Sequence, residues 1–300
     1  MEKARLGRTE LNVTKLGYGA MEIRGPRVWS GRPVTGEQAE RILNEVLDAG
    51  ITFIDTSYDY GRSEEFIGQY ISHRRQEYTL ATKCGCTFVD CGDHDDTPHV
   101  WTRDNLLHNI DTSLTRMKTD YIDLLQLHGP TVAQAEEGRL VEVLREIQAT
   151  GKVRWIGISS YLPHLPSFIE CGDFDTFQIP YSALEREHEA LIAQAASSGA
   201  GIILRGGVAQ GEPGVGRGLS ERWARWEKAN LDELLDEGES RTGFLLRFTL
   251  SNPNLSTTIV GTMKPEHLRE NVKAANKGPL SSEIYAEAIR RLNEVNSFME

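Results

Sequence analysis

Short hydrophobic runs recur along the whole chain. Eight of them are rich in β-branched residues and apolar at consecutive positions, which is the pattern of strands that are covered on both sides. They lie at residues 16–21, 51–55, 78–83, 121–128, 153–159, 174–181, 201–206 and 257–261. The pattern therefore predicts eight buried strands.

Amphipathic helical patterns lie between these runs. In residues 35–49 the apolar positions recur with a period of 3.6, which predicts a helix with one buried face. Thr35 and Gln38 have the spacing of a capping box, and Gly50 stands where such a helix would end. Similar apolar stripes predict helices at 106–117, 140–147, 190–196 and 244–250.

Alternation of strands and helices implies right-handed parallel crossovers. Eight strands favour a (β/α)₈ TIM barrel over a doubly wound sheet, and no G-x-G-x-x-G motif follows the first strand to support a Rossmann fold. We therefore predict an α/β protein with one barrel domain over residues 1–300. We also predict an N-terminal β-hairpin at 4–14 that closes one barrel end, and extra C-terminal helices.

Two segments are longer than ordinary connections. Residues 87–99 are polar and rich in Asp and His, and residues 210–239 contain a glycine-rich stretch followed by a Trp-containing helical pattern. Long loops of this kind are usually functional or mobile. The glycine-rich part, 211–218, is either a lid over a ligand or a simple connection. Trp29 and Trp101 either line an aromatic substrate pocket or pack structurally.

Composition and charge exclude several classes of protein. The 300 residues are 39% hydrophobic with a net charge of −11, a globular balance that argues against nucleic-acid or anionic-membrane partners. No apolar run reaches the length of a membrane span, and the polar start lacks the core of a signal peptide. Four cysteines are typical of a reducing compartment. We expect a cytoplasmic protein, and no feature specifies an oligomeric state.

Polar side chains stand where several predicted strands end. Asp55 ends the second strand with Tyr60 five residues later, Lys83 ends the third, and His128 ends the fourth. Each alone is more typical of a rim or packing residue. Because barrel enzymes carry their active sites at the carboxyl ends of the strands, their conjunction on consecutive strands predicts an active site.

This set of side chains suits one kind of chemistry. A tyrosine phenol has a pKa of about 10, which a nearby Lys83 ammonium would lower, while Asp55 would keep the lysine charged. His128 can donate a hydrogen bond to a carbonyl oxygen. The arrangement suits protonation of an oxyanion as hydride reaches a carbonyl carbon. Because no side chain supplies hydride, a cofactor is required.

Four segments resemble a known family. Residues 54–64, Ile-Asp-Thr-Ser-Tyr-Asp-Tyr-Gly-Arg-Ser-Glu, resemble the Asp-Thr-Ala-x-x-Tyr-Gly signature of the aldo-keto reductases. Residues 81–83, 120–128 and 157–160 are similar to the lysine, histidine and Gly-Val-Ser-Asn segments of that family. The resemblance runs in order from about residue 5 to about residue 275. It is greatest to the bacterial and channel-β-subunit-like branches.

The resemblance implies an NADPH-dependent reductase of small-molecule carbonyl substrates. It makes Tyr60 the general acid, tuned by Lys83 and Asp55, with His128 orienting the carbonyl. It also implies a set of cofactor-binding residues, which comprises Gly19, Ala20, Met21, Asp55, Ser159, Ser160, Gln178, Arg205, Gly206, Gly207, Ala209, Gly211, Gly261, Thr262, Lys264, His267, Glu270 and Asn271. Among these, Ser159, Ser160 and Gln178 match positions that hold the nicotinamide carboxamide.

Lys264 bears on the choice between NADPH and NADH. Pro265 suits the first turn of a helix, and the free amides of a helix start favour anions. Lys264 would then meet the 2′-phosphate, which predicts a preference for NADPH. The alternative is a plain surface lysine that precedes a helix.

Two residues depart from the family pattern. Arg205 occupies the place on the seventh strand where an aromatic ring usually stacks on the nicotinamide. A planar guanidinium can stack too, and it would repel the positive charge of the oxidised ring. We therefore hypothesise that Arg205 eases release of oxidised cofactor. Ser160 replaces the usual asparagine, which predicts fewer or water-mediated carboxamide contacts.

Three alternatives concern metals and function. The segment with Cys84, Cys86, Cys91, His94 and His99 suggests a zinc site, but it lacks a C-x-x-C pair, so we expect loop packing and no metal. A metal-dependent hydrolase would need more histidines and carboxylates at strand ends. A cofactor-binding but catalytically slow regulatory subunit, similar to channel β subunits, stays open as the alternative function.

Overall fold

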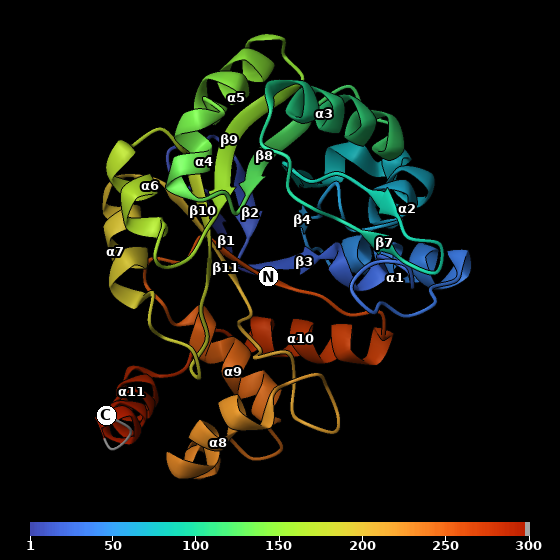
Figure 1. The fold of residues 1–300 in the computed structure, drawn as a ribbon. Coiled ribbons are helices and arrows are strands. Elements are labelled where there is room, and N and C mark those ends of the chain that lie inside the picture. The colour runs from blue at the N-terminus through green and yellow to red at the C-terminus, as the bar shows by residue number, and fades with distance from the viewer. Residues whose placement is uncertain (298–300) are drawn as a thin grey trace.

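Eight parallel strands close into a barrel in the computed structural model, which describes residues 1–297 (Figure 1). The strand order around the barrel is β10-β11-β12-β3-β4-β5-β8-β9. The strands are β3 (Leu16–Gly19), β4 (Phe53–Asp55), β5 (Thr79–Cys84), β8 (Ile122–His128), β9 (Val153–Ser159), β10 (Thr176–Pro180), β11 (Gly201–Arg205) and β12 (Thr257–Val260). The predicted TIM barrel and its eight strands are confirmed.

The strand register brings the carboxyl ends level with one another. Asp55 on β4 pairs with Ala81 on β5, Lys83 pairs with Gln126 on β8, and His128 pairs with Ser159 on β9. Polar residues at the ends of neighbouring strands therefore face one mouth, as the barrel architecture requires.

Helices surround the barrel, with α8, α9 and α11 gathered beyond α10 in Figure 1. The α-helices are α1 (Gly36–Asp48), α2 (Ser63–Tyr70), α3 (Arg103–Met117), α4 (Val132–Glu137), α5 (Leu140–Ala149), α6 (Leu165–Cys171), α7 (Glu189–Ser197), α8 (Ser220–Lys228), α9 (Arg241–Leu250), α10 (Pro265–Lys277) and α11 (Ser282–Ser297). Three 3₁₀ helices are η1 (Ala20–Ile23), η2 (Ser72–Glu77) and η3 (Leu231–Leu234). The predicted capping box is present, since Thr35 and Gln38 exchange hydrogen bonds at the start of α1.

An N-terminal hairpin, β1 (Lys3–Arg5) and β2 (Asn12–Thr14), closes the amino-terminal end of the barrel. Gly7 at its turn has a φ of +57°, and a Cβ there would lie 2.0 Å from the Gly201 amide nitrogen, so only glycine fits. The hairpin contributes to a fully buried cluster at the barrel floor that comprises Leu6, Val13, Phe53, Ala81, Leu124 and Ile203. The predicted closing hairpin is therefore confirmed.

The segment 87–99, predicted as a loop, contains a second small hairpin. Its strands are β6 (Val89–Asp90) and β7 (Asp95–Asp96), which are too short and too polar to stand out in the sequence. Arg27 binds it from outside, because its guanidinium donates to Asp90 at 2.8 Å and to Asp95 at 2.6 Å. Within residues 1–297, none of the helices has the length and apolar character needed to cross a membrane.

Candidate active site

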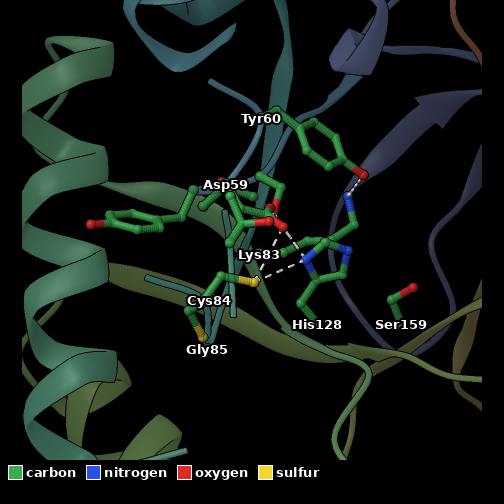
Figure 2. A network of polar contacts seen from close by, with 12 residues as sticks. Asp59, Tyr60, Lys83, Cys84, Gly85, His128 and Ser159 are labelled. Atoms are coloured by element: carbon green, nitrogen blue, oxygen red, sulfur yellow. Dashed lines mark hydrogen bonds and ion pairs between the residues drawn. The ribbon is translucent and has the colours of Figure 1, made fainter. Parts of the chain in front are cut away.

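A buried ion pair lies at the centre of the barrel mouth. Lys83 on β5 donates from Nζ to Asp55 Oδ2 at 2.5 Å and to the Thr56 carbonyl at 2.9 Å. Its third contact is the Tyr60 hydroxyl at 3.4 Å, and Figure 2 shows this hydroxyl directed at the lysine nitrogen. Asp55 and Lys83 are both 1% exposed. The structure thus brings together three of the four predicted catalytic residues.

The second oxygen of Asp55 is also fully engaged. Oδ1 accepts from Gln126 Nε2 at 2.9 Å and from Gln178 Nε2 at 2.8 Å. The side-chain oxygen Oε1 of Gln178 in turn accepts from the Ser159 hydroxyl at 3.3 Å. The backbone carbonyl of Gln178 accepts from the Ser160 amide at 3.1 Å. These contacts offset the cost of burying a charge. They also engage both ends of the Gln178 side-chain amide in hydrogen bonds to other residues of the site.

Tyr60 is held on a tight turn between β4 and α2. Its amide donates to the Ser57 carbonyl at 3.1 Å, and its carbonyl accepts from the Ser63 amide at 2.8 Å. Gly61 follows with a φ of +45°, and a Cβ there would lie 2.2 Å from the Arg24 carbonyl oxygen. The turn therefore needs glycine, and it aims the phenol into the mouth.

The pKa of Tyr60 lies above its ordinary value. Burial disfavours the phenolate, and this effect exceeds the lowering effect of the Lys83 ammonium. The sequence-based expectation of a lowered pKa for Tyr60 is therefore wrong for this structure, because it considered the charge of Lys83 and not the loss of water. The pKa of Lys83 is raised, since Asp55 and Tyr60 together outweigh the effect of its burial.

His128, the fourth predicted residue, ends β8 beside a group that the sequence analysis missed. Its Nδ1 lies 3.3 Å from Asp59 Oδ1, 3.3 Å from the Ser57 hydroxyl and 3.5 Å from Cys86 Sγ. Figure 2 shows Asp59 and His128 joined in this network, and the His128 ring stands edge-on to Tyr60 at 6.0 Å between centroids. Asp59 directly precedes Tyr60 in the motif, which is the signal that could have identified it.

Asp59 is a buried carboxylate that stays charged. Burial would raise its pKa, but the neighbouring His128 and hydrogen bonds from Ser57 and Cys86 lower the pKa to about 2. The thiol of Cys86 donates to Asp59 Oδ2 at 3.3 Å. Asp59 therefore accepts hydrogen bonds from several sides and fixes the orientation of the His128 ring.

Aromatic rings surround the mouth. Trp29 is 43% exposed, stands edge-on to Tyr60 at 5.5 Å, and donates from Nε1 to the Thr97 hydroxyl at 3.0 Å. Trp101 stacks instead on His99, with ring centroids 5.2 Å apart. For these two tryptophans the sequence left pocket lining and structural packing open, and in the structure Trp29 is the one that packs against the Tyr60 ring.

Two groups of residues that are expected to bind the cofactor lie at the ends of β3 and β12. The sequence pattern predicted that the first strand continues to Met21. In the structure β3 ends at Gly19, and Ala20 and Met21 belong to η1. Gly261 lies close to Gly19, because a Cβ on Gly261 would stand 2.5 Å from the Gly19 carbonyl oxygen. The two strand ends therefore meet closely at the rim.

The start of α10 has the form of an anion site. Lys264 is the exposed N-cap residue, Pro265 opens the helix, and the Lys264 side chain does not cap the first amides. Thr262 accepts through its hydroxyl from the Lys264 amide at 3.0 Å. Uncapped amides at a helix start attract negative groups. Along the same helix, His267 is half-buried, Glu270 is exposed and Asn271 is buried.

Arg205 ends β11 as a half-buried cation at the mouth. Within residues 1–297 its side chain has no hydrogen bond or ion pair to another residue. Gly206 and Gly207 follow it, and the Gly207 carbonyl accepts from the Thr249 hydroxyl at 3.0 Å. Ala209 has a φ of +47°. This turn directs the chain toward the glycine-rich loop.

The glycine-rich loop, residues 211–218, reaches back across the rim to η1. Arg217 forms an ion pair with Glu22 at 3.4 Å, and Glu22 also binds Arg32 at 3.2 Å. Gly211 lies at the base of the loop with a φ of +78°. The Arg217–Glu22 ion pair therefore links the loop to the segment that follows β3.

Two groups of metal-ligating side chains are present within residues 1–297. One brings donor atoms of Cys86, His99 and His128 within 4.8 Å of one another, and the other consists of Cys91, His94 and Asp96, which are all exposed. Cys84 belongs to neither, because its buried thiol faces the Gln126 carbonyl at 3.6 Å. The predicted Cys/His segment is thus divided, and its inner part meets the active-site histidine.

Comparison with known proteins gives one consistent family. Residues 15–294 match the model of the aldo/keto reductase family. The chain is 30% identical to an uncharacterised oxidoreductase of Bacillus subtilis, YqkF, over 94% of each chain. It is 26% identical to the NADH-specific methylglyoxal reductase of Escherichia coli, over 92% of this chain and 94% of that one.

A solved structure agrees with this result. The holo form of aldo-keto reductase AKR11C1 from Bacillus halodurans superposes with a TM-score of 0.84 at 28% identity, covering 97% of this chain and 96% of the other. The similarity therefore extends over the barrel and over the segments that carry the site. The chain belongs to the aldo/keto reductase family.

Proposed function

We propose that this protein reduces an aldehyde or ketone to an alcohol with NADPH, and that Tyr60 donates the proton. The observation that supports the proposal is the buried Lys83–Asp55 pair, which contacts the Tyr60 hydroxyl at the mouth while His128 stands beside it. The substrate oxygen would bind between the Tyr60 hydroxyl and the His128 ring.

Each residue of the site has a separate role in this reaction. NADPH supplies the hydride for the carbonyl carbon. As negative charge grows on the substrate oxygen, the proton on Tyr60 Oη moves to that oxygen, and Lys83 stabilises the phenolate that forms. Asp55 keeps Lys83 charged and oriented. Asp59 holds the His128 ring so that it can bind the carbonyl oxygen.

The residues present fit a dinucleotide cofactor. The uncapped amides of α10 with Lys264 suit a phosphate, and the unpaired Arg205 lies at the mouth where a nicotinamide would need a planar partner. Ser159 and Gln178 lie at the same end of the barrel, where they would bind the nicotinamide carboxamide. Residues 211–218 would cover the pyrophosphate. Arg205 would ease release of the oxidised cofactor by charge repulsion.

Replacement of the phenol tests the reaction. Tyr60→Phe should lower kcat for NADPH-dependent reduction of a panel of aldehydes by about 10²–10⁴, because general acid catalysis contributes that much. Tyr121→Phe is the matched control, since Tyr121 precedes β8 at the opposite end of the barrel and its hydroxyl accepts a hydrogen bond from Gln76 at 3.5 Å, away from the mouth. Full activity of Tyr60→Phe, or no NADPH consumption by the wild type with any carbonyl, would contradict the proposal.

Cofactor choice is tested at Lys264. One charge-assisted contact to the 2′-phosphate contributes about 1.5–3 kcal/mol, so Lys264→Ala should raise KM for NADPH about 10- to 100-fold and leave KM for NADH unchanged. Lys273→Ala, on a later turn of α10, is the control. The NADH-specific relative from Escherichia coli makes the opposite result a real alternative. Equal or lower KM for NADH in the wild type would overturn the preference.

A further inference from the structure

The mouth of the barrel holds a set of metal-ligating atoms that the proposed reaction does not explain. Cys86 follows β5, His128 ends β8, and His99 lies after the small hairpin β6–β7. An isolated antiparallel bridge joins Cys86 to His99, so the backbone itself keeps these two residues together. Donor atoms of all three side chains lie within 4.8 Å of one another.

We propose that Cys86, His99 and His128 form a site for Zn²⁺ or a similar divalent cation. Occupation of this site would inhibit the enzyme by making His128 a metal ligand. A thiolate and two imidazoles are a ligand set that zinc favours, and three protein ligands leave a fourth position for water. On binding, the Cys86 thiol would lose its proton to solvent and coordinate as the thiolate.

The observed spacing agrees with zinc coordination. Zn–S and Zn–N bonds of about 2.3 and 2.0 Å at a tetrahedral angle place sulfur and nitrogen about 3.5 Å apart. Cys86 Sγ and His128 Nδ1 are 3.5 Å apart. His99 is exposed at the mouth and stacks on Trp101, so a small rotation of one surface side chain would complete the set.

Asp59 strengthens the case for a cation at this place. Its carboxylate contacts both inner ligands at 3.3 Å, to Cys86 Sγ and to His128 Nδ1, and it is 1% exposed. A carboxylate this close attracts a cation, and a metal bound through Sγ and Nδ1 would take the place of the protons that these contacts now hold. Together with the Cys86 thiolate it would balance the charge of a divalent ion in a buried setting.

The second Cys/His group is the competing location. Cys91, His94 and Asp96 lie on the hairpin β6–β7 and are all exposed. The Arg27 guanidinium also contacts this hairpin, with bonds to Asp90 and Asp95, and its positive charge opposes a cation. The inner group therefore has the better preorganised geometry, and the outer one provides a matched control.

Cobalt titration of the full-length protein, purified without a histidine tag, tests the site independently of catalysis. Co²⁺ should bind one equivalent with the charge-transfer absorption of a cobalt–thiolate bond. Cys86→Ser should abolish that absorption, His99→Ala should weaken binding at least tenfold, and Cys91→Ser should change neither. The His99→Ala variant keeps the test decisive should Cys86→Ser fail to fold. Absence of the band in the wild type, or its loss only in Cys91→Ser, would overturn the proposal.

The inhibitory part rests on the proposed function and needs an activity readout. Zn²⁺ at saturating concentration should lower the aldehyde reduction rate at least tenfold, and a chelator should restore it. His99→Ala, compared with its own metal-free rate, should need at least tenfold more Zn²⁺ for the same inhibition. Cobalt binding without any reductase activity would refute the proposed function and leave the metal site intact. Reductase activity without cobalt binding would refute the metal site and leave the proposed function intact.

Discussion

Tyr60 experiences two opposing effects that decide how it works. Burial favours the neutral phenol, while Lys83, 3.4 Å from the hydroxyl, favours the phenolate. Burial prevails, so the pKa of Tyr60 lies above its usual value of about 10. The residue is thus a proton donor at neutral pH, and Lys83 acts chiefly by stabilising the phenolate once the proton has left.

The pH dependence of the reaction should reflect this balance. A donor with a raised pKa stays protonated below that pKa and loses its proton only above it, so Tyr60 should cause no fall in kcat/KM for reduction between pH 6 and about 9. Alcohol oxidation needs the deprotonated form and should rise about tenfold per pH unit in that range. Rate profiles in both directions measure this. A Tyr60-dependent loss of reduction below pH 9 would show that Lys83 prevails instead.

Residue types in the motif made Asp55, Tyr60, Lys83 and His128 predictable from sequence, since each lies at the end of a recognisable strand or shortly after one. Asp59 was not predictable by the same reasoning, although it adjoins Tyr60, because its partner His128 is distant in sequence and only the barrel brings them together. The net pKa of Tyr60 was also beyond sequence reasoning, because burial depends on the whole surrounding structure.

Elements with a strong hydrophobic period were predicted well. The strand 153–159 matches β9, and the capping box of α1 is present as expected, because a run of apolar residues and the chemistry of a helix cap are both local properties of the sequence. The end of the first strand was placed two residues too far, since Ala20 and Met21 are apolar enough to continue a strand but turn into η1. The polar hairpin β6–β7 has no hydrophobic pattern to reveal it.

The glycine-rich loop offers a prediction at the scale of an element. Its ion pair from Arg217 to Glu22 is partly exposed, and such pairs contribute about 0.2–1 kcal/mol. If this contact fastens a lid over bound cofactor, Arg217→Ala should speed NADPH dissociation up to about fivefold, as measured by stopped-flow fluorescence. Arg32→Ala is the control, because Arg32 binds the same Glu22 from outside the loop. Equal effects of the two variants would argue against a lid.

In the whole molecule the polar residues of the candidate site lie at one end of the barrel, and a purely apolar cluster lies at the other. Its net charge is −11, yet Arg205 lies at the end of β11 and Lys264 lies shortly after β12, both on the side of the mouth. The bulk surface therefore opposes polyanions, while the mouth suits one small phosphate-bearing ligand. The opposite end is closed by the hairpin β1–β2, and its buried cluster consists of apolar side chains.

This separation predicts that the barrel floor can be weakened without loss of catalysis. Leu6→Ala removes a fully buried side chain from the cluster that the hairpin shares with Phe53 and Ile203, so it should lower the free energy of unfolding by about 2–5 kcal/mol. Below the unfolding midpoint, kcat/KM should equal that of the wild type, because the hairpin closes the end of the barrel away from Tyr60. Urea titration and steady-state kinetics on the same preparation measure both quantities.

Leu219→Ala, at a position 58% exposed, is the control and should change the free energy of unfolding by no more than about 0.5 kcal/mol. A loss of kcat/KM in folded Leu6→Ala would mean that the floor supports the geometry of the mouth, and the two ends would then have to be treated as one coupled unit.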